Sequence, residues 1–288
     1  MHIALALVTG ASTGIGRATT LRLAAGGWTV LAGVRDPDAG ERLTQDAGPA
    51  GRVVALALDV TDGAQLSAAA ELVERDAATA GASLRGGLDA LVNNAGIGVG
   101  GPLELVSAED LRRQFEVNVF AQVAVTQAML PMLRRAGGRI VFVSSIGGRV
   151  AMAFTAPYAA SKHAIEAFGD ALRVELRSSG VRVALVEPGS VATPIWGKAR
   201  EEAERTSIPS ELQAYYGQVP AALGKVIEDT ARRGVTPELV ADTIAGALAA
   251  RRMRARYVVG RDAWAMLLAK RVLPDLVFDR VARRALGV

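Results

Sequence analysis

Short apolar runs alternate along the chain with longer stretches in which apolar and polar residues are mixed. The runs are nearly continuous in Val, Ile, Leu and Ala, as expected for strands that are covered on both faces of a parallel sheet. They lie at residues 3–9, 29–34, 53–58, 88–92, 139–143, 181–186 and 256–259. The stretches between them are long enough for crossover helices. This pattern predicts an α/β fold, a doubly wound parallel sheet of about seven strands flanked by helices.

Two segments depart from this alternation. Residues 195–234 mix Glu, Arg, Tyr and Pro, and we expect them to form a helical insertion at the C-terminal edge of the sheet, where substrate-binding loops usually lie. Residues 261–288 combine apolar and basic side chains in an amphipathic pattern that breaks near Pro274. We therefore divide the chain into one domain, residues 1–260, which includes the insertion, and a basic amphipathic C-terminal extension, residues 261–288.

The 288 residues are 50% hydrophobic and 22% charged, which is typical of a soluble globular protein. The absence of cysteine excludes disulfides, thiolate zinc sites and cysteine nucleophiles. The two histidines, His2 and His163, do not form a metal-ligand pattern, so we expect no metal site. The first residues are typical of a strand rather than a signal peptide, and Val117 to Leu133 is too polar to span a membrane. These features predict a cytoplasmic protein.

A glycine-rich loop, TGASTGIG, follows the first predicted strand. It contains Gly10, Gly14 and Gly16 and leads into a helical pattern that starts at Arg17. Backbone N–H groups of such a loop can approach a pyrophosphate closely, and the helix dipole adds positive potential at the same place. The loop predicts a dinucleotide site, and a plain strand-to-helix turn is the alternative.

The end of the second strand bears on which dinucleotide is bound. Arg35 follows Val34 directly, and a guanidinium at this place can pair with a 2′-phosphate. This favours NADP(H). Asp36 would instead accept hydrogen bonds from the ribose hydroxyls if the strand ran one residue further, so NAD(H) is possible. An exposed turn is the third interpretation of these two residues.

A serine, a tyrosine and a lysine form the candidate catalytic group. Ser145 lies thirteen residues before Tyr158, and Lys162 lies four residues after that tyrosine. Pro157 can begin a helix, which puts Tyr158 in its first turn and Lys162 on the same face one turn later. We expect the ammonium and the helix start to lower the pKa of the phenol, so that it exchanges protons near neutral pH. An exposed pair on a helix is the alternative.

Together with these motifs, LDVTD, NNAG, FEVNVF and PGSVATP give the sequence a clear resemblance to the short-chain dehydrogenase/reductase family, in its single-domain branch. The resemblance covers roughly residues 3–195. Within the family, the sequence is similar to hydroxysteroid and retinol dehydrogenase-like members. It implies a Rossmann-type fold and an NADP(H)-dependent oxidoreductase that interconverts a secondary alcohol and its ketone or aldehyde. The alternatives are a nucleotide-binding regulator without turnover and a ketoacyl-carrier-protein reductase.

The resemblance also assigns roles to residues. It implies that Tyr158 donates the proton, Ser145 hydrogen-bonds the carbonyl oxygen, Lys162 binds the nicotinamide ribose and Asn118 positions a water. Asp59 is expected at the adenine, Thr193 at the carboxamide and Ser12 at the 2′-phosphate. The full set of expected cofactor contacts is Gly10, Ser12, Gly14, Ile15, Gly16, Arg35, Asp59, Val60, Asn93, Ala95, Gly96, Tyr158, Lys162, Pro188, Gly189 and Thr193.

Apolar and aromatic residues are the candidates for the substrate pocket. They come from loops that follow strand ends and from the insertion: Val99, Met152, Phe154, Ile195, Trp196, Leu212, Tyr215, Tyr216, Val219 and Leu223. Their character predicts a lipophilic substrate that is steroid-, retinoid- or long-chain-like. Packing of the insertion onto the sheet is the alternative for each of them.

Two features concern larger partners. Residues 251–288 contain ten Lys or Arg and three Asp, so the extension could lie on an anionic membrane, although packing on its own domain or on a neighbouring subunit is favoured. No nucleic-acid-binding motif accompanies this charge, and we expect no nucleic acid. The family resemblance implies a homodimer or homotetramer that pairs through residues 110–135 and 157–177.

Overall fold

The computed structural model describes residues 4–48, 52–79, 86–195, 197 and 208–286. Its strands are β1 (Leu5–Thr9), β2 (Thr29–Val34), β3 (Arg52–Ala57), β4 (Ala90–Asn93), β5 (Arg139–Val143), β6 (Arg182–Pro188) and β7 (Arg256–Val259). All neighbouring strands run parallel, in the order β3-β2-β1-β4-β5-β6-β7. The predicted doubly wound, seven-stranded sheet is confirmed. Its strand ends differ from the predicted ones by one or two residues, which is the usual uncertainty of such boundaries.

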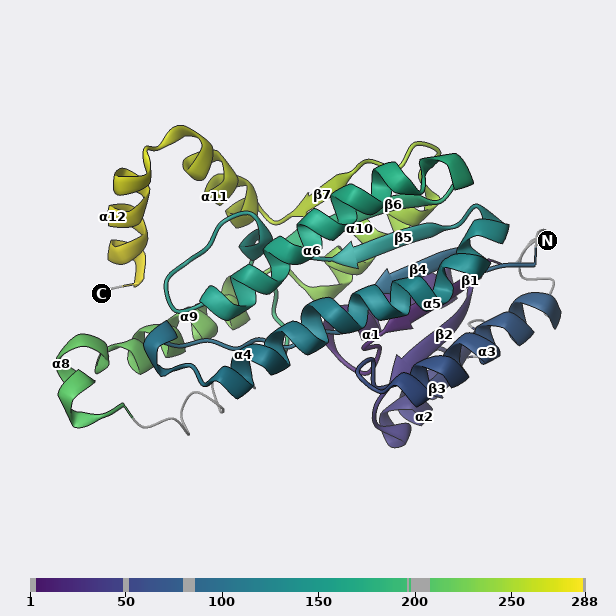
Figure 1. Cartoon of the computed structure of the whole chain (residues 1–288), viewed down its shortest axis with the longest axis horizontal. Helices are drawn as coiled ribbons and strands as arrows, with labels where there is room; N and C mark the ends of the chain where they lie inside the picture. Colours follow the sequence, from purple (N-terminus) through teal and green to yellow (C-terminus); the bar gives the residue numbers. More distant parts are fainter. Residues whose placement is uncertain (1–3, 49–51, 80–85, 196, 198–207, 287–288) are drawn as a thin grey trace.

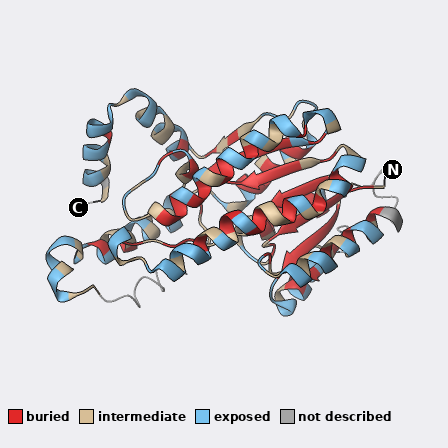
Figure 2. Cartoon of the chain, in the orientation of Figure 1, coloured by how far each residue is buried: buried red, intermediate tan, exposed pale blue. Residues whose placement is uncertain are grey.

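Helices cover both faces of the sheet (Figure 1). One face carries α1 (Gly14–Ala25), α2 (Pro37–Asp46) and α10 (Pro237–Ala249), and the other carries α3 (Gly63–Thr79), α5 (Ala121–Ala136) and α6 (Ala156–Glu175). The alternation of side chains along each strand divides the core accordingly. Leu5 and Leu7 of β1 belong to one apolar cluster, and Ala6 and Val8 to the other. Figure 2 shows the strands buried almost throughout.

The direction of chain progression reverses between β1 and β4. From β1 the chain moves outward through β2 and β3, and from β4 it moves the other way to β7. The loops that follow the carboxyl ends of these two central strands therefore separate and leave a crevice, which is where ligands bind in open α/β sheets. This topology places the glycine loop after β1 and the NNAG segment after β4 on opposite sides of one crevice.

The predicted insertion and extension are both helical. The described part of the insertion contains η5 (Ser210–Leu212), α8 (Gln213–Tyr216) and α9 (Val219–Arg233), while Trp196 and residues 198–207 lie outside the described residues. The extension contains α11 (Arg261–Val272) and α12 (Asp275–Leu286), which meet at Leu273 and Pro274 as expected from the break in the pattern. Helix α12 turns back toward α9 (Figure 1).

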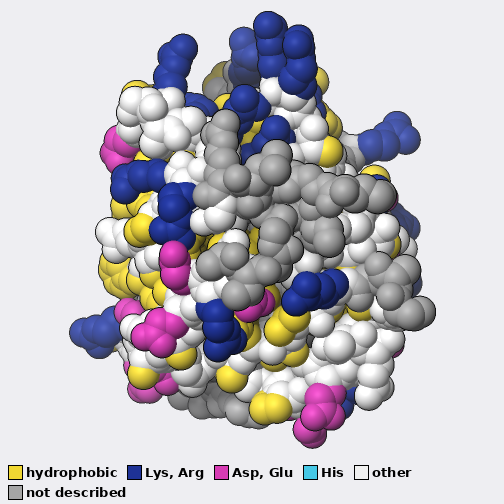
Figure 3. All heavy atoms as spheres, turned by 90° about the vertical axis from the view of Figure 1, so that its right-hand side faces the viewer, with side chains coloured by type: hydrophobic (Ala, Val, Ile, Leu, Met, Phe, Trp, Pro, Cys, Tyr) yellow, Lys and Arg dark blue, Asp and Glu magenta, His cyan; other side chains and the backbone are white. Residues whose placement is uncertain are grey.

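Figure 3 shows the side of the molecule where the chain begins, and the Lys and Arg side chains on this side are densest along the upper edge of the view. In the part of the chain that the structure describes, no helix is both long enough and apolar enough to cross a bilayer.

Candidate active site

Two adjoining cavities open at the carboxyl end of the sheet. The larger, of about 600 Å³, lies at the crevice between β1 and β4, and the smaller, of about 250 Å³, lies under α9 and α11. Ser145, Tyr158 and Gly189 line both. The two predicted catalytic hydroxyls therefore stand at the junction, where a group bound in one cavity can meet a group bound in the other.

The glycine loop forms one wall of the larger cavity. Gly10 and Gly14 have φ values of 63° and 52°, in the left-handed region that side chains other than glycine rarely adopt. A Cβ atom on Gly10 would lie 2.9 Å from Cα of Ala95 across the crevice. Helix α1 begins here, and its N-cap residue Thr13 makes no side-chain capping hydrogen bond. The first-turn N–H groups thus keep their capacity to bind an anion.

The two charged residues that follow β2, Arg35 and Asp36, lie in different surroundings. The strand ends at Val34, and Arg35 is exposed and lines the larger cavity. The Asp36 carboxylate accepts a hydrogen bond of 3.0 Å from the backbone N of Asp38 and so caps α2. It also lies 3.6 Å from Arg42. Arg35 therefore faces the cavity, whereas Asp36 is engaged by its own helix.

Most of the other predicted cofactor contacts line the same cavity: Gly10, Ser12, Gly14, Ile15, Arg35, Asp59, Val60, Ala95, Gly96, Tyr158, Lys162, Pro188, Gly189 and Thr193. Ile195, predicted for the substrate, lines this cavity too. The pKa of Asp59 in this cavity lies below its ordinary value. Burial raises it, but hydrogen bonds from Thr61 and the nearby Arg35 charge together lower it by more.

Two predicted cofactor contacts lie elsewhere. A Cβ atom on Gly16 would lie 2.1 Å from the carbonyl oxygen of Gly10, so Gly16 allows the loop to pack on α1 rather than lining the cavity. Asn93 is the last residue of β4, and its side chain donates 2.9 Å to Thr126 in the core. Because neighbours on a strand point to opposite faces, its successor Asn94 lines the cavity instead. Asn94 donates to the carbonyl oxygens of Thr9 and Gly10 at 2.9 and 3.0 Å.

Ser145, Tyr158 and Lys162 come together as their spacing predicts. Ser145 follows β5 and accepts a 3.0 Å hydrogen bond from the N–H of Gly147, which begins a tight turn, η3 (Ile146–Gly148). Tyr158 lies in the first turn of α6 and its side chain is hydrogen-bonded to Ser145. The Lys162 ammonium lies 5.8 Å from the centre of the Tyr158 ring and donates 2.8 Å to the carbonyl oxygen of Val143.

The predicted lowering of the tyrosine pKa is wrong. Burial raises the pKa of Tyr158, and the hydrogen bond with Ser145 opposes this only in part. Burial also lowers the pKa of Lys162 to about 8, partly offset by the charge of Glu166. The sequence could not show that both groups are largely buried, which disfavours the charged form of each. The structure therefore places a protonated phenol, not a phenolate, at the junction of the cavities.

Asn118 occupies a five-residue π-helical turn, η2 (Glu116–Phe120), between α4 (Ala108–Phe115) and α5. Its Oδ1 accepts 2.8 Å from the N–H of Ile97, and its Nδ2 donates to Ile97 O at 3.0 Å and to Ser161 Oγ at 3.1 Å. Turns of this type are frequent at functional sites. Here the turn fastens the loop after β4 to α6, and the water-positioning role expected of Asn118 stays a prediction.

The smaller cavity is largely apolar. The predicted residues Val99, Met152, Phe154, Val219 and Leu223 line it, together with Leu105, Val106, Val150, Val226, Ile227 and Met266. Phe154 adopts φ 65°, which is rare for a bulky side chain and marks this loop as constrained. Among the described lining residues the charged ones are Asp110 and Asp262, and none is basic.

The structure places Tyr215 and Tyr216 outside this cavity. Tyr215 is 77% exposed, and the Tyr216 hydroxyl donates 2.8 Å to Glu104. Leu212, the last residue of η5, does not line the cavity either, because η5 and α8 carry these three residues away from it and residues of α9 line it instead. Trp196, the remaining predicted contact, lies outside the described residues.

Comparison with known proteins agrees with this geometry. A family model described as short chain dehydrogenase matches residues 4–204. The chain belongs to the short-chain dehydrogenase family. An NADPH-dependent 3-dehydrocapnine reductase from Ornithobacterium rhinotracheale is 35% identical over 281 residues, which are 96% of this chain and 95% of that protein. Human retinol dehydrogenase 5 is 36% identical over 290 residues, 96% of this chain and 87% of that protein.

A solved structure of this family is similar throughout. A short-chain dehydrogenase/reductase from Burkholderia phymatum, determined in complex with NAD, superposes with a TM-score of 0.77 and 27% identity. The match covers 94% of this chain and 93% of that chain. The chain is thus an oxidoreductase of the short-chain dehydrogenase family, and its relatives include proteins named for either dinucleotide.

Asn94 falls within the NNAG segment, residues 93–96, which the family resemblance implies at the adenosine side of the cofactor cleft, and it lines the larger cavity. Two further residues of this short-chain dehydrogenase site were not predicted from the sequence. Gln114 donates 3.0 Å to Ile97 O and accepts 2.6 Å from Val99 N, four residues before Asn118, and that helical spacing is a usable signal. Asp262 accepts 2.7 Å from the N–H of Ser190, which is 72 residues away and has no local signal.

Proposed function

We propose that this chain is an NADP(H)-dependent oxidoreductase that interconverts a secondary alcohol and its ketone or aldehyde, acting on a lipophilic substrate. The observation that carries the proposal is the place of Ser145 and Tyr158 at the junction of a dinucleotide-sized crevice and an apolar cavity. A regulator without turnover would not need a buried hydroxyl pair at this junction with a lysine directly behind it.

The chemistry follows from charge development at the substrate oxygen. The nicotinamide cofactor, when bound, supplies hydride to the carbonyl carbon or accepts it from the carbinol carbon. Negative charge then builds on the oxygen, and Ser145 and Tyr158 both present hydroxyls that can hydrogen-bond it. The raised pKa of Tyr158 keeps its proton in place at neutral pH, so the phenol can deliver that proton to the oxygen during reduction. Lys162 lies one helical turn after Tyr158 and provides a cation next to the phenol.

The residues of the larger cavity fit a dinucleotide. The uncapped start of α1 and the left-handed glycines suit a pyrophosphate, and Asp59 with Val60 would flank the adenine. Arg35 reaches the cavity while Asp36 caps α2, so the group available beside the adenine ribose is a guanidinium rather than a carboxylate. This supports a preference for NADPH, as does the NADPH-dependent relative.

The apolar lining of the smaller cavity supports a lipophilic substrate. The apolar side chains of this lining suit a lipophilic substrate, and an anionic head group would meet Asp110 and Asp262 rather than a basic residue. The relative named retinol dehydrogenase agrees with this choice. We keep residues 1–260 as the oxidoreductase domain, to which Asp262 and Met266 of the extension add part of the cavity wall.

The C-terminal helices also offer a surface for a membrane. The outer face of α11 exposes Trp264, Leu268 and Val272, spaced by four residues, and α12 continues this face with Leu276, which is 82% exposed. Exposed basic residues lie along both helices: Arg261, Arg271, Arg280, Arg283 and Arg284. A second copy related by a two-fold axis would bring these like charges together. We therefore take an anionic bilayer surface as the partner of this face and expect a cytoplasmic protein that associates with membranes peripherally.

A liposome experiment tests this surface. The protein should cosediment with vesicles that contain phosphatidylglycerol but not with pure phosphatidylcholine vesicles. The double variant W264S/L268S should lose most of the binding, whereas Leu239→Ser, at a 48% exposed apolar position on α10, should keep it. Equal sedimentation of the double variant would reject the membrane, and its conversion from dimer to monomer would assign the face to a second copy.

Exposed apolar residues also mark the predicted oligomer interface. Leu111, Phe120, Phe168 and Val174 are 38%, 57%, 40% and 71% exposed on the outer faces of α4 to α6. Such residues are typical of an interface. A homodimer or homotetramer is therefore proposed, and light scattering of a Phe168→Asp variant should give a smaller mass than the unmodified protein.

The proposed reaction is tested by absorbance at 340 nm with a panel of lipophilic carbonyl compounds, run with NADPH and with NADH. The expected result is faster oxidation of NADPH, and faster turnover of long-chain or polycyclic ketones than of small keto acids. Binding of NADPH without turnover of any carbonyl compound in the panel would favour a regulator instead.

A further inference from the structure

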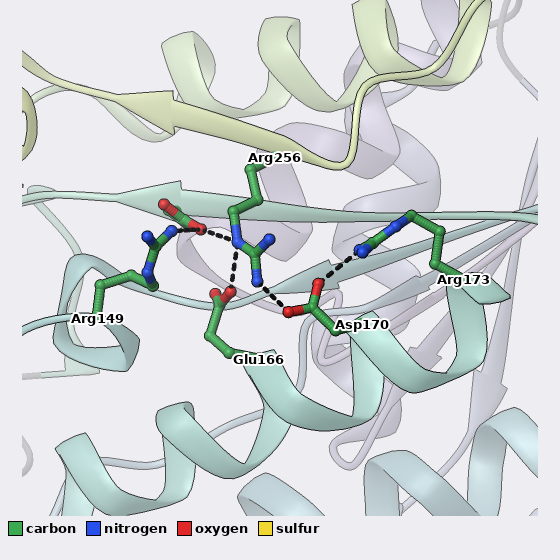
Figure 4. Close-up of polar contacts among 6 residues, drawn as sticks. Arg149, Glu166, Asp170, Arg173 and Arg256 are labelled. Carbon is green, nitrogen blue, oxygen red and sulfur yellow. Dashed lines mark hydrogen bonds and ion pairs between the residues drawn. The ribbon is translucent and has the colours of Figure 1, made fainter.

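A cluster of charged side chains lies beneath the loop that carries Ser145, and the proposed reaction does not use it (Figure 4). Its residues come from four elements that converge here: Arg149 from the end of η3, Glu166, Asp170 and Arg173 from α6, Glu187 from β6 and Arg256 from β7. Glu187 is completely buried, and Glu166 is nearly so. A charged group so far from water needs partners, and the cluster provides them for one oxygen of each glutamate, while Glu166 Oε1 and Glu187 Oε2 make no hydrogen bond.

The Arg256 guanidinium holds three carboxylates at once. Its Nε donates 3.0 Å to Glu166 Oε2 and lies 2.9 Å from Glu187 Oε1, and its terminal nitrogen donates 2.7 Å to Asp170 Oδ2. A planar guanidinium has donors fixed in several directions, so this geometry also fixes the relative positions of α6, β6 and β7.

Glu187 extends the cluster to the serine loop. Its Oε1 also accepts a hydrogen bond of 3.1 Å from a terminal nitrogen of Arg149. Arg149 ends the turn that begins after Ser145, and Glu187 directly precedes Pro188 and Gly189, which line the larger cavity. The cluster thus joins the turn after β5, which begins beside the predicted catalytic serine, to the end of the neighbouring strand β6.

Glu166 ties the same cluster to the helix of Tyr158 and Lys162. It lies four residues after Lys162 on α6, and the serine loop approaches it closely at Gly148. A Cβ atom on Gly148 would lie 2.8 Å from Ser144 Oγ and 3.0 Å from both Glu166 Cγ and Lys162 O. The serine loop and α6 are therefore packed too closely to slide past one another. The ion pairs that run from Arg149 through Glu187 and Arg256 to Glu166 connect the same two segments.

Stability alone does not account for this cluster, since apolar side chains packed at the same place would stabilise the fold at least as well. Replacing a buried ion cluster by apolar side chains of similar volume is often neutral or stabilising, because removing charges from water is costly. Burial and the nearby Glu166 carboxylate raise the pKa of Glu187 to about 7, although Arg149 and Arg256 act in the opposite direction. What the ion pairs add is directional specificity, since they allow one arrangement of the segments rather than several.

We propose that Arg256 and Glu187 are positioning residues, which lock the Ser145 loop, the Tyr158 and Lys162 helix and the segment leading to Gly189 into one arrangement. Neither residue lines the two cavities in the described part of the chain, so both act through these segments. Their effect on catalysis rests on the proposed oxidoreductase function, whereas the locking itself does not.

Kinetics of Arg256→Met and Glu187→Gln test the effect on catalysis. We expect kcat per folded molecule to fall about tenfold or more, because small misplacements of reacting groups are costly, while KM for NADPH changes less than about threefold. Arg256→Lys should rescue only in part, since one ammonium cannot bridge three carboxylates in fixed directions. Full rescue by lysine would show that charge alone matters and would overturn the positional role.

Arg173→Met is the matched control. Arg173 contacts Asp170 at 2.5 Å from the outer edge of the cluster and does not reach Glu187 in the contacts found. Its kcat should stay within about twofold of the unmodified protein. If Arg256→Met does not fold, Arg149→Met, whose side chain is 39% exposed, should still lower kcat and thereby keep the test decisive.

Hydrogen exchange measured by mass spectrometry reads the locking without turnover. In Glu187→Gln, peptides covering residues 144–152, 156–168 and 188–192 should exchange faster together, while those of β1 and α1 should not change. Faster exchange confined to the peptide around residue 187, or a lowered melting temperature with unchanged kcat, would overturn the proposal. If the unmodified protein reduces no carbonyl compound, the proposed function fails, and the exchange result still decides the locking.

Discussion

The two cavities of the site are built in different ways. The larger one is formed mainly by segments that directly follow strands β1 to β6, together with residues of α4, η2 and α6, and several of these segments carry a recognisable motif, such as TGASTGIG or NNAG. The smaller one is formed by the loops around Val99 and Met152, by α9 and by Met266 of α11, which are far apart in the sequence. The cofactor side is therefore a local product of the strand ends, whereas the substrate side exists only once distant helices have packed.

This difference predicts that substitutions are tolerated more readily in the smaller cavity than in the larger one. Close backbone approaches, such as that of Gly10 to Ala95, leave little freedom on the cofactor side. The apolar residues of α9 and α11 can change without disturbing the sheet, since they pack over its edge. Function is thus set by a constrained half and a variable half that meet at Tyr158.

The largest effect should come from the junction itself. Tyr158→Phe removes the proton donor but keeps the ring, and we expect the rate of ketone reduction to fall by about 10²- to 10⁴-fold. NADPH binding, followed by its fluorescence, should be preserved. Tyr216→Phe is the control, because that hydroxyl contacts Glu104 outside the cavity, and its activity should not change. A Tyr158→Phe enzyme with full activity would separate the two halves and refute the shared junction.

A change on the cofactor side should affect only the dinucleotide. Arg35→Ser removes the guanidinium from the larger cavity, and kcat/KM for NADPH should fall about 10- to 100-fold because charge-assisted hydrogen bonds to a phosphate are lost. The value for NADH and the KM for the ketone should hardly move. Arg42→Ser, one turn into α2 and away from the cavity, should leave the NADPH value unchanged. Equal losses with both dinucleotides would argue against a 2′-phosphate contact.

A change on the substrate side should do the reverse. Leu223→Asp places a carboxylate in the apolar cavity, and KM for a lipophilic ketone should rise about tenfold or more. The KM for NADPH should not change. Leu239→Asp, at a 48% exposed position on α10, provides the matched control for the same substitution. An unaltered ketone KM in the Leu223 variant would show that the substrate binds elsewhere.

Asp262→Asn should have a smaller effect that touches both halves. The carboxylate accepts from Ser190 N, next to Gly189, which lines both cavities. Asparagine can still accept this bond but without the charge, so we expect about a two- to fivefold loss of kcat/KM for both NADPH and the ketone. Asp275→Asn, on the exposed start of α12, is the control. A loss confined to one of the two substrates would place Asp262 in that half alone.

The smallest expected effect is a shift in pH dependence. Burial lowers the pKa of Lys162 to about 8, and the Glu166 charge opposes this. If the ammonium supports the reaction, the rate falls as pH rises through this value, since the lysine loses its proton. Glu166→Gln removes the opposing charge, so the pKa should drop further and the fall in rate should begin at lower pH. Rates measured from pH 6 to 9.5 show this, and a shift to higher pH would contradict the assignment.

The sequence predicted the sheet well because each buried parallel strand is a continuous apolar run. Most of the residues predicted to contact the cofactor line the larger cavity, since most of them follow a strand end within a short motif. Gly16 and Asn93 do not line this cavity, because a shift of one residue changes the direction in which a side chain points, and the motif alone does not show that direction. Tyr215 and Tyr216 differ because the direction of α8 depends on tertiary packing.

The electrostatic state of the site was also beyond the sequence. The four-residue spacing of Tyr158 and Lys162 indicates their proximity, but burial decides their pKa values, and burial is a property of the whole fold. The same holds for Arg256, whose three carboxylate partners lie 69 to 90 residues earlier in the chain. No local pattern connects them.

The most direct measurement of the shared junction is transfer of a labelled hydride. The protein is incubated with NADPH deuterated at the transferable C4 position and with a panel of lipophilic ketones, and the alcohol formed is examined by mass spectrometry. One deuterium on the carbinol carbon of each product molecule is the predicted result. Bound NADPH together with alcohol that carries no deuterium, or with no alcohol at all, would contradict the meeting of the two cavities at Tyr158.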